Sequence, residues 1–370
     1  MQLKKNIILS ICISTVIVLM NCTCSVEKKN TEVHKEKSET TVHTDSYTTL
    51  VAYISAVTTE LQQIFPEEKI ADPTPFTEKM DNICAHLKNA GKEQLHSPHL
   101  VDSILSLVYD TWQITFDPDR ENLSSLLPHT VITSKRGSCL GVSLLFLLIA
   151  EKLHYPLYGI LLPGHFFVRY DDGNVYRNIE PNKKGYNHPL AYYRWRYEVE
   201  DNSWYTMKNL SLAEVIAVVN YNLANICIKK GKVTQAKQFY RGCLAGLPDF
   251  AEAWGNYALA FIACRQPDSA RLAFRRAYSL QPDLPGLAQN RGAFELGLAQ
   301  YDSALAIYQN GLRYFSDDSE LLYGAAYSFY SLGCFDSAVV YLRRVGDITD
   351  IAGREYKLYQ LIKENQLRKK

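Results

Sequence analysis

The sequence predicts a chain of the α+β class, in which a helical lead-in and a core with a small antiparallel sheet precede an all-α superhelix. Three observations support this prediction. An almost wholly apolar helix begins at Cys139, two β-rich runs flank Asp172-Gly173, and alanine returns at a fixed step of 34 residues from Ala236 onward. The chain has 370 residues, which is enough for two or three domains.

Composition excludes several classes of function. The chain has 40 Lys and Arg against 39 Asp and Glu, for a net charge of +1, and its basic residues form no long run. We therefore expect no nucleic-acid partner. The nine cysteines include no C-x-x-C pair, and there is no H-E-x-x-H motif. No metal site and no cofactor are expected.

The first residues resemble a bacterial lipoprotein signal. Lys4 and Lys5 precede an apolar run over 7–20 that is short for a membrane span, and Leu19 stands three residues before Cys22. We expect Cys22 to carry the lipid, and the alternatives are lipidation at Cys24, ordinary cleavage with secretion, or an uncleaved anchor. Residues 26–46 are polar and charged, so they predict a flexible tether. The expected location is the bacterial cell envelope, with the chain anchored to the membrane.

A helical lead-in follows the tether. Apolar residues recur at helical spacing over 50–64, 80–87 and 100–112, and prolines at 73, 75 and 118 interrupt the pattern. We expect these helices to pack against the helix that begins at Cys139. The histidines of this region predict surface or packing roles rather than metal ligation.

Cys139 is the first candidate for chemistry. Ser138 is a good N-cap residue, and it places Cys139 in the first turn of the helix that follows. Unpaired N–H groups and the helix dipole stabilise a thiolate at that position. The alternative is a structural cysteine at the start of a core helix.

A predicted hairpin supplies partners for this cysteine. If Asp172-Gly173 is the centre of a two-residue turn, paired positions sum to 345, and His165 lies directly opposite Glu180 on the same face. A carboxylate in that position fixes the tautomer of an imidazole and stabilises its cation. A slip by one residue would separate the two side chains, and a plain surface pair is the alternative.

The motifs Arg136-Gly-Ser-Cys139-Leu-Gly, Leu162-Pro-Gly-His165-Phe-Phe-Val-Arg-Tyr170 and Asn178-Ile-Glu180-Pro together resemble the transglutaminase-like superfamily, and in particular its bacterial branch that carries tetratricopeptide repeats. The resemblance covers roughly residues 100–205. It implies a papain-like triad with Cys139 as nucleophile, His165 as general base and Glu180 as acid, where the superfamily usually has Asp. The implied reaction is thiol-dependent amide chemistry, hydrolysis rather than transfer being the leading expectation.

Small and large residues recur in phase through the last part of the chain, and this pattern indicates tetratricopeptide repeats. Three columns step by 34: Ala236, Ala270, Ala304, Ala338; Ala224, Ala258, Gly292, Ala326; and Tyr240, Phe274, Tyr308, Leu342. Such repeats stack into a superhelix with a concave surface, which predicts a protein or peptide partner.

The predicted organisation has six parts. They are a lipoprotein-type signal (1–24), a tether (25–46), a helical subdomain (47–130), a transglutaminase-like core (131–210), four tetratricopeptide repeats (211–350) and a C-terminal capping helix (351–370). The aromatic residues between 185 and 205 either line a substrate groove or cover the sheet where it meets the next domain, and we favour the second. A competing hypothesis for the whole chain is a non-catalytic binding or adaptor lipoprotein that acts through its repeats.

Overall fold

The computed structural model describes residues 47–68, 70–90, 98–119, 122–199, 204–346 and 353–368. The predicted signal and tether, with Cys22 and Cys24, lie outside these residues. The described part falls into two compact units that meet in the sequence at Pro248 and Asp249. We describe each unit by itself.

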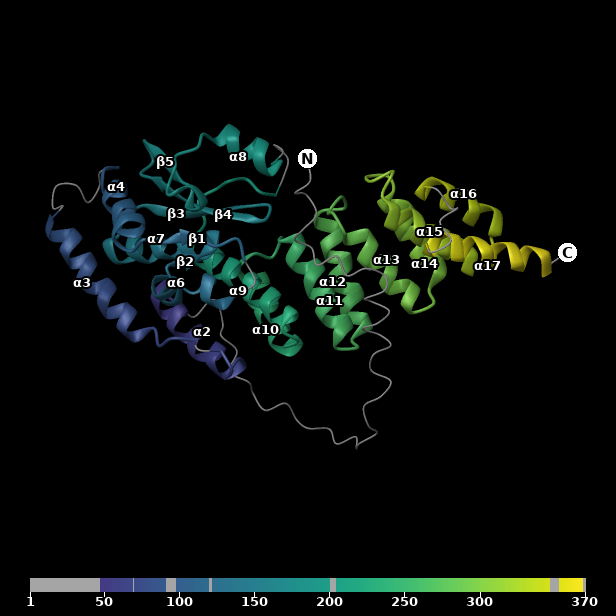
Figure 1. Ribbon diagram of the computed structural model, residues 1–370, viewed down its shortest axis with the longest axis horizontal. Helices are drawn as coiled ribbons and strands as arrows, with labels where there is room; N and C mark the ends of the chain where they lie inside the picture. Colours follow the sequence, from purple (N-terminus) through teal and green to yellow (C-terminus); the bar gives the residue numbers. More distant parts are fainter. Residues whose placement is uncertain are drawn as a thin grey trace, which may run out of the picture. The chain divides into compact units, whose positions relative to one another are not determined.

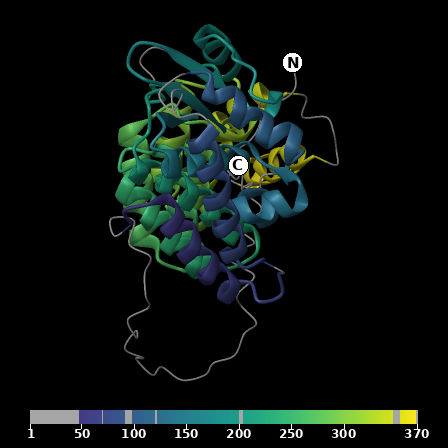
Figure 2. The same ribbon diagram turned by 90° about the vertical axis from the view of Figure 1, so that its left-hand side faces the viewer.

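The first unit opens with the helical lead-in, drawn in purple and blue and facing the viewer in Figure 2. Its elements are α2 (Leu50–Ile64), α3 (Thr74–Ala90), α4 (Leu100–Leu105), the π-helix η2 (Ser106–Thr111), α5 (Leu123–Leu126) and α6 (Pro128–Ser134). Thr49 caps α2 by accepting a hydrogen bond from the Ala52 N–H. The helix expected over 100–112 is α-helical only in its first half, because α4 continues as the π-helix η2. Pro75 lies inside the first turn of α3, where its missing N–H removes no helical bond.

The central element is α7 (Cys139–Leu153). Ser138 caps it as expected, accepting a hydrogen bond from the Gly141 N–H at 3.1 Å. Every residue from Cys139 to Ala150 is buried, which agrees with its apolar composition on all faces. Figure 1 shows α7 with strands of the sheet on one side and α2 and α6 on the other, and both sides contact it. The helix is therefore the core of this unit.

The sheet has three antiparallel strands in the order β3 (Leu157–Leu162), β4 (His165–Asp171) and β5 (Tyr176–Ile179). A separate two-residue parallel pair joins β1 (Thr115–Phe116) to β2 (Arg136–Gly137), directly before α7. The short helix η3 (Pro181–Lys183) and α8 (Leu190–Tyr197) follow β5.

The register of the β4–β5 hairpin differs from the prediction. Val168 pairs with Ile179 and Arg169 with Asn178, so paired positions sum to 347 rather than 345. The connection is a four-residue loop over 172–175, in which the Asp172 carboxylate accepts hydrogen bonds from the N–H groups of Asn174 (2.9 Å) and Val175 (2.8 Å). The predicted two-residue turn is wrong because this side chain stabilises a longer loop.

The first helix pair of the repeats belongs to the same unit. It consists of α9 (Leu212–Lys229) and α10 (Val233–Gly246), and Ser211 with Glu214 forms a capping box at the start of α9. The Tyr53 hydroxyl donates a 2.8 Å hydrogen bond to Asn220 of α9, which ties the lead-in to this pair. Among the described helices, α9 has the length and composition of a membrane span, but most of it is buried within the protein.

The second unit is entirely helical. Its elements are α11 (Ala251–Ala263), α12 (Pro267–Leu280), α13 (Leu287–Gly297), α14 (Tyr301–Gly311), α15 (Ser319–Ser331), α16 (Phe335–Val345) and α17 (Arg354–Arg368). Ala270, Ala304 and Ala338 are fully buried, as the step of 34 predicts for close contact between the helices of a pair. In α17, Leu358 and Ile362 pack against Ala338 and cover the apolar end of the last pair.

Candidate active site

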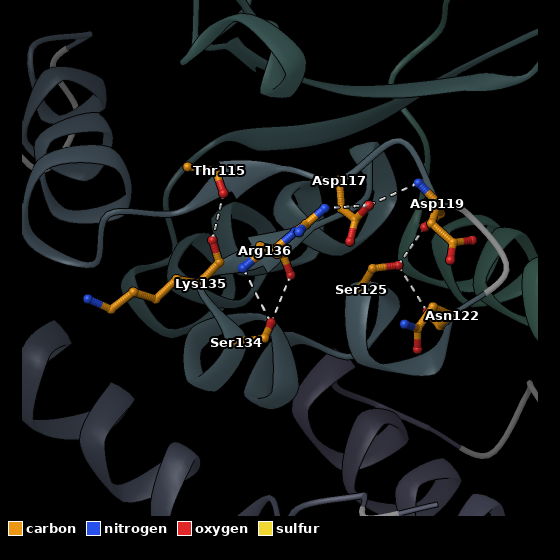
Figure 3. A network of polar contacts seen from close by, with 8 residues as sticks. All are labelled: Thr115, Asp117, Asp119, Asn122, Ser125, Ser134, Lys135 and Arg136. Carbon is orange, nitrogen blue, oxygen red and sulfur yellow. Dashed lines mark hydrogen bonds and ion pairs between the residues drawn. The ribbon is translucent and has the colours of Figure 1, made fainter.

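The chain that leads to Cys139 is fixed by a polar network, shown in Figure 3. The Thr115 hydroxyl donates to the Lys135 carbonyl at 3.0 Å, and Arg136 forms an ion pair with Asp117 at 3.4 Å. The Ser125 hydroxyl donates to the Asp119 carbonyl at 2.8 Å. These contacts hold the β1–β2 pair in place, so α7 begins at a defined point.

The backbone beside the cysteine is packed closely. The Ser138 N–H donates to the Ser125 carbonyl at 2.8 Å, and a Cβ atom at Gly141 would lie 2.1 Å from the same oxygen. Only glycine therefore fits at this point of the first turn of α7. The close approach of two backbone segments explains the Cys-Leu-Gly sequence.

His165 and Glu180 meet as the sequence predicted, although their register differs. Their Nε2 and Oε2 atoms lie 2.9 Å apart, and both side chains are buried. The register shift is two residues, and because side chains alternate with a period of two, both still share one face. Continuing the observed pairing places Glu180 opposite Phe167, diagonal to His165. A glutamate is long enough to cross this diagonal.

The second oxygen of the Glu180 carboxylate is also held. Its Oε1 atom accepts a 3.1 Å hydrogen bond from the Asn182 N–H in the first turn of η3. The backbone of Glu180 forms a bridge with Tyr186. The carboxylate is thus fixed at both oxygens, with one of them directed at the imidazole.

The other side of the imidazole faces Cys139. Burial alone would lower the pKa of His165, but hydrogen bonds to Cys139 and Glu180 outweigh burial and raise this pKa to about 9. The raised pKa favours the protonated form of the imidazole. Cys139 lies in the first turn of α7, is 6% exposed and forms no disulfide. A thiol, an imidazole and a carboxylate from three separate elements converge here.

Comparison with known families agrees with this geometry. Residues 74–187 match the family model of the transglutaminase-like superfamily, and this range contains Cys139, His165 and Glu180. The chain contains a transglutaminase-like domain. Residues 217–245 and 251–284 match tetratricopeptide repeats, which supports a protein or peptide partner for that region. A search of the curated proteins found no match.

Solved structures resemble part of the chain. A crystal structure of MamA has 15% identity and a TM-score of 0.37, over 41% of this chain and 82% of that one. MamA from Desulfovibrio magneticus RS-1 has 14% identity and a TM-score of 0.37, over 40% and 85%. YrrB, described as a TPR protein with an unusual peptide-binding site, has 18% identity and a TM-score of 0.36, over 40% and 77%.

Two tyrosines of α8 stack on side chains of β4. The Tyr197 ring is parallel to the His165 ring, with centroids 4.6 Å apart and an interplanar angle of 1°. Tyr193 stacks on Phe167 at 4.1 Å and 7°. Burial, followed by the charge of Glu180, raises the pKa of both phenols, so they remain neutral. The cluster of aromatic residues drew attention to this segment in the sequence. It did not predict that a tyrosine ring would stack on the imidazole of His165.

The histidines of the described part of the domain do not gather into a metal site. Within the ranges that the structure describes, no group of three or more His, Cys, Asp or Glu side chains is placed to hold one. His129 is buried against Phe76, and His86 and His99 are exposed. His96 lies outside the described residues.

Proposed function

We propose that this protein is a cysteine-dependent acyl-transfer enzyme that hydrolyses an amide bond in a protein or peptide of the cell envelope. The observation that carries the proposal is the meeting of Cys139, His165 and Glu180, with the thiol at a helix N-terminus and the imidazole bonded to a buried carboxylate. Helix N-termini and imidazolium neighbours both stabilise a thiolate, which is the reactive form of cysteine.

In the first step, the Cys139 sulfur attacks the amide carbonyl carbon and forms a tetrahedral oxyanion. The Cys139 N–H, at the N-terminus of α7, would donate a hydrogen bond to this charge. The His165 imidazolium then gives its proton to the amide nitrogen, the C–N bond breaks, the amine leaves, and a thioester remains on the sulfur.

In the second step, His165 accepts a proton from water, and the resulting hydroxide attacks the thioester carbonyl. The C–S bond breaks, the carboxylic acid leaves, and the thiolate–imidazolium pair forms again. Glu180 stays hydrogen-bonded to the imidazole in both steps and holds the ring orientation. An amine in place of water would give a transferase.

Access to the sulfur requires movement of α8. The His165 side chain has no exposed surface, and Tyr197 covers its ring. Of the eight residues of α8, only Tyr193 is fully buried, so few side chains hold this helix in place. We infer that a substrate displaces Tyr197 and takes its position beside the imidazole.

The test compares the alkylation rates of two cysteines in the folded chain by iodoacetamide at pH 7. Cys334 is an exposed free cysteine, so it reports ordinary thiol reactivity. We expect Cys139 to react faster than Cys334 despite its burial, and faster than in denatured chain. His165→Ala should slow only Cys139, by about 100-fold or more. Equal rates for Cys139 in folded and denatured protein would contradict the proposal.

One observation favours a second candidate, a non-catalytic adaptor. The closed site, with Tyr197 on the imidazole, is what a binding protein with an inherited fold would also show. In that case a Cys139→Ala variant would keep every measurable property, including partner capture by the repeats. If the protein is an enzyme, the Cys139→Ala variant should instead lose turnover and retain its uncleaved substrate.

We also propose that Cys22 carries a lipid that anchors the protein in the cell envelope, which rests on the sequence pattern alone. Cys22→Ser should move the protein from the membrane fraction to the soluble fraction. Cys24→Ser is the matched control and should leave the protein in the membrane fraction.

A further inference from the structure

Three residues of β4 face α8 in an ordered row. His165, Phe167 and Arg169 alternate along the strand and therefore lie on one face of the sheet. Tyr197 covers the first of them, and Tyr193 covers the second. Removing α8 from this face would uncover the imidazole of His165 and the ring of Phe167, and the guanidinium of Arg169 follows next along the strand.

The third member of this row, Arg169, is a buried cation with incomplete hydrogen bonding. It is 8% exposed. Its Nε donates to Asn178 Oδ1 at 2.9 Å and its Nη1 to the Met207 carbonyl at 2.9 Å. Its Nη2 is buried and has no partner. A buried donor without an acceptor destabilises the folded state, so such an atom calls for an explanation.

In the part of the chain that the structure describes, no acidic side chain neutralises this guanidinium by direct contact. Among the described residues, none forms an ion pair with Arg169, and the charge that acts on it is that of Asp171. The Asp171 carboxylate is itself occupied by the Gly173 N–H and by the Asn209 amide. The flat faces next to the guanidinium are aromatic, with ring centroids at 5.9 Å (Phe167) and 5.5 Å (Tyr176).

A planar cation between aromatic rings with a free donor edge is suited to a carboxylate, which guanidinium binds through paired hydrogen bonds. We infer that Arg169 determines substrate specificity by binding a carboxylate of the substrate once the Tyr193 ring has left Phe167. This inference rests on the proposed function, and it narrows the substrate class to acidic peptides.

The spacing of the row defines the substrate further. Strand residues rise by roughly 3.3 Å each, so Arg169 lies about 13 Å along the strand from His165. An extended peptide with its reacting carbonyl at the imidazole therefore places a side chain on Phe167 and an acidic group two residues beyond. The ring of Tyr193 shows that the Phe167 position accepts an aromatic group.

The experiment measures peptide binding to the full-length Cys139→Ala protein by calorimetry. The probe is acetyl-Ala-Glu-Ala-Phe-Ala-Glu-Ala-amide, which presents the same spacing in either chain direction, and its control carries Gln in place of both Glu residues. We expect the acidic peptide to bind at least tenfold more tightly. In Arg169→Gln the two peptides should bind equally. The exposed Arg194 of α8 offers a matched control, and Arg194→Gln should keep the tenfold difference.

Each result decides the question. If the Cys139→Ala protein with Arg169 intact binds the two peptides equally, or binds neither, the inference is overturned. It is also overturned if the preference for the acidic peptide survives Arg169→Gln. If that variant does not fold, Arg169→Lys, which keeps the charge but loses the paired donors, should reduce the preference without abolishing it. Failure of Cys139 to react with iodoacetamide would instead overturn the proposed enzyme, because that measurement does not involve Arg169.

Discussion

Shortening Glu180 by one methylene tests the geometry of the site most directly. Glu180→Asp withdraws the carboxylate by about 1.5 Å, the length of one C–C bond. The present Nε2···Oε2 distance is 2.9 Å, so the gap exceeds hydrogen-bond range. A hydrogen bond between charged groups contributes about 1.5–3 kcal/mol, and one pKa unit corresponds to about 1.4 kcal/mol. We therefore expect the pKa of His165 to fall by about one to two units.

The assay is an NMR titration of the His165 ring in protein with isotope-labelled histidine, starting from a wild-type pKa of about 9. The sign of the stability effect follows from linkage. A raised pKa stabilises the folded state fully below the unfolded value of about 6.5, and this stability is lost as the pH rises through the folded pKa. As the pH rises, Glu180→Asp should thus lose this contribution to stability at a lower pH than the wild-type protein does. Glu78→Asp, at an exposed position of α3, should change nothing. An unchanged His165 pKa in Glu180→Asp would refute the reasoning.

Three further predictions concern the surroundings of the thiol. Gly141→Ala should destabilise the protein by about 1–3 kcal/mol in urea unfolding, because the new Cβ meets the Ser125 carbonyl at 2.1 Å; an unchanged midpoint would contradict that contact. Tyr197→Ala should speed alkylation of the thiol by uncovering the imidazole, whereas Trp195→Ala, which changes an exposed side chain of the same helix, should not. Burial lowers the pKa of His129 to about 4, so stability should fall as pH drops from about 6.5 to 4. His129→Phe should remove this acid sensitivity in pH-dependent thermal unfolding.

Local patterns were sufficient to predict most of the elements. The N-cap at Ser138, the buried helix after it and the columns of alanine depend on short-range sequence rules, and the structure agrees with each. The turn of the β4–β5 hairpin was wrong because Asp172 bonds two backbone N–H groups and favours a four-residue loop over a two-residue one. The error of two residues left the alternation intact, so His165 and Glu180 still meet.

Contacts between distant segments could not be predicted in the same way. The stacking of Tyr197 on His165 depends on the path of the chain from β5 through α8, and no periodicity encodes that path. The incomplete hydrogen bonding of Arg169 was also invisible, since its partners lie at Asn178 and Met207. Sequence rules identified the reactive side chains. The rings that stack on them and the hydrogen-bond partners around them could be seen only in the structure.

The docking of α9 and α10 onto the lead-in has a practical meaning for anyone who divides this chain. A fragment that stops at residue 210, where the repeat pattern starts, would lack Asn220, the hydrogen-bond partner of Tyr53. It would also expose to solvent the surface of the lead-in that contacts α9. Such a fragment should aggregate, whereas one that extends to Pro248 keeps the compact unit whole. The first repeat is thus a structural part of the unit that contains Cys139. The boundary that matters for folding lies after α10, one helix pair later than the point where the repeat pattern begins in the sequence.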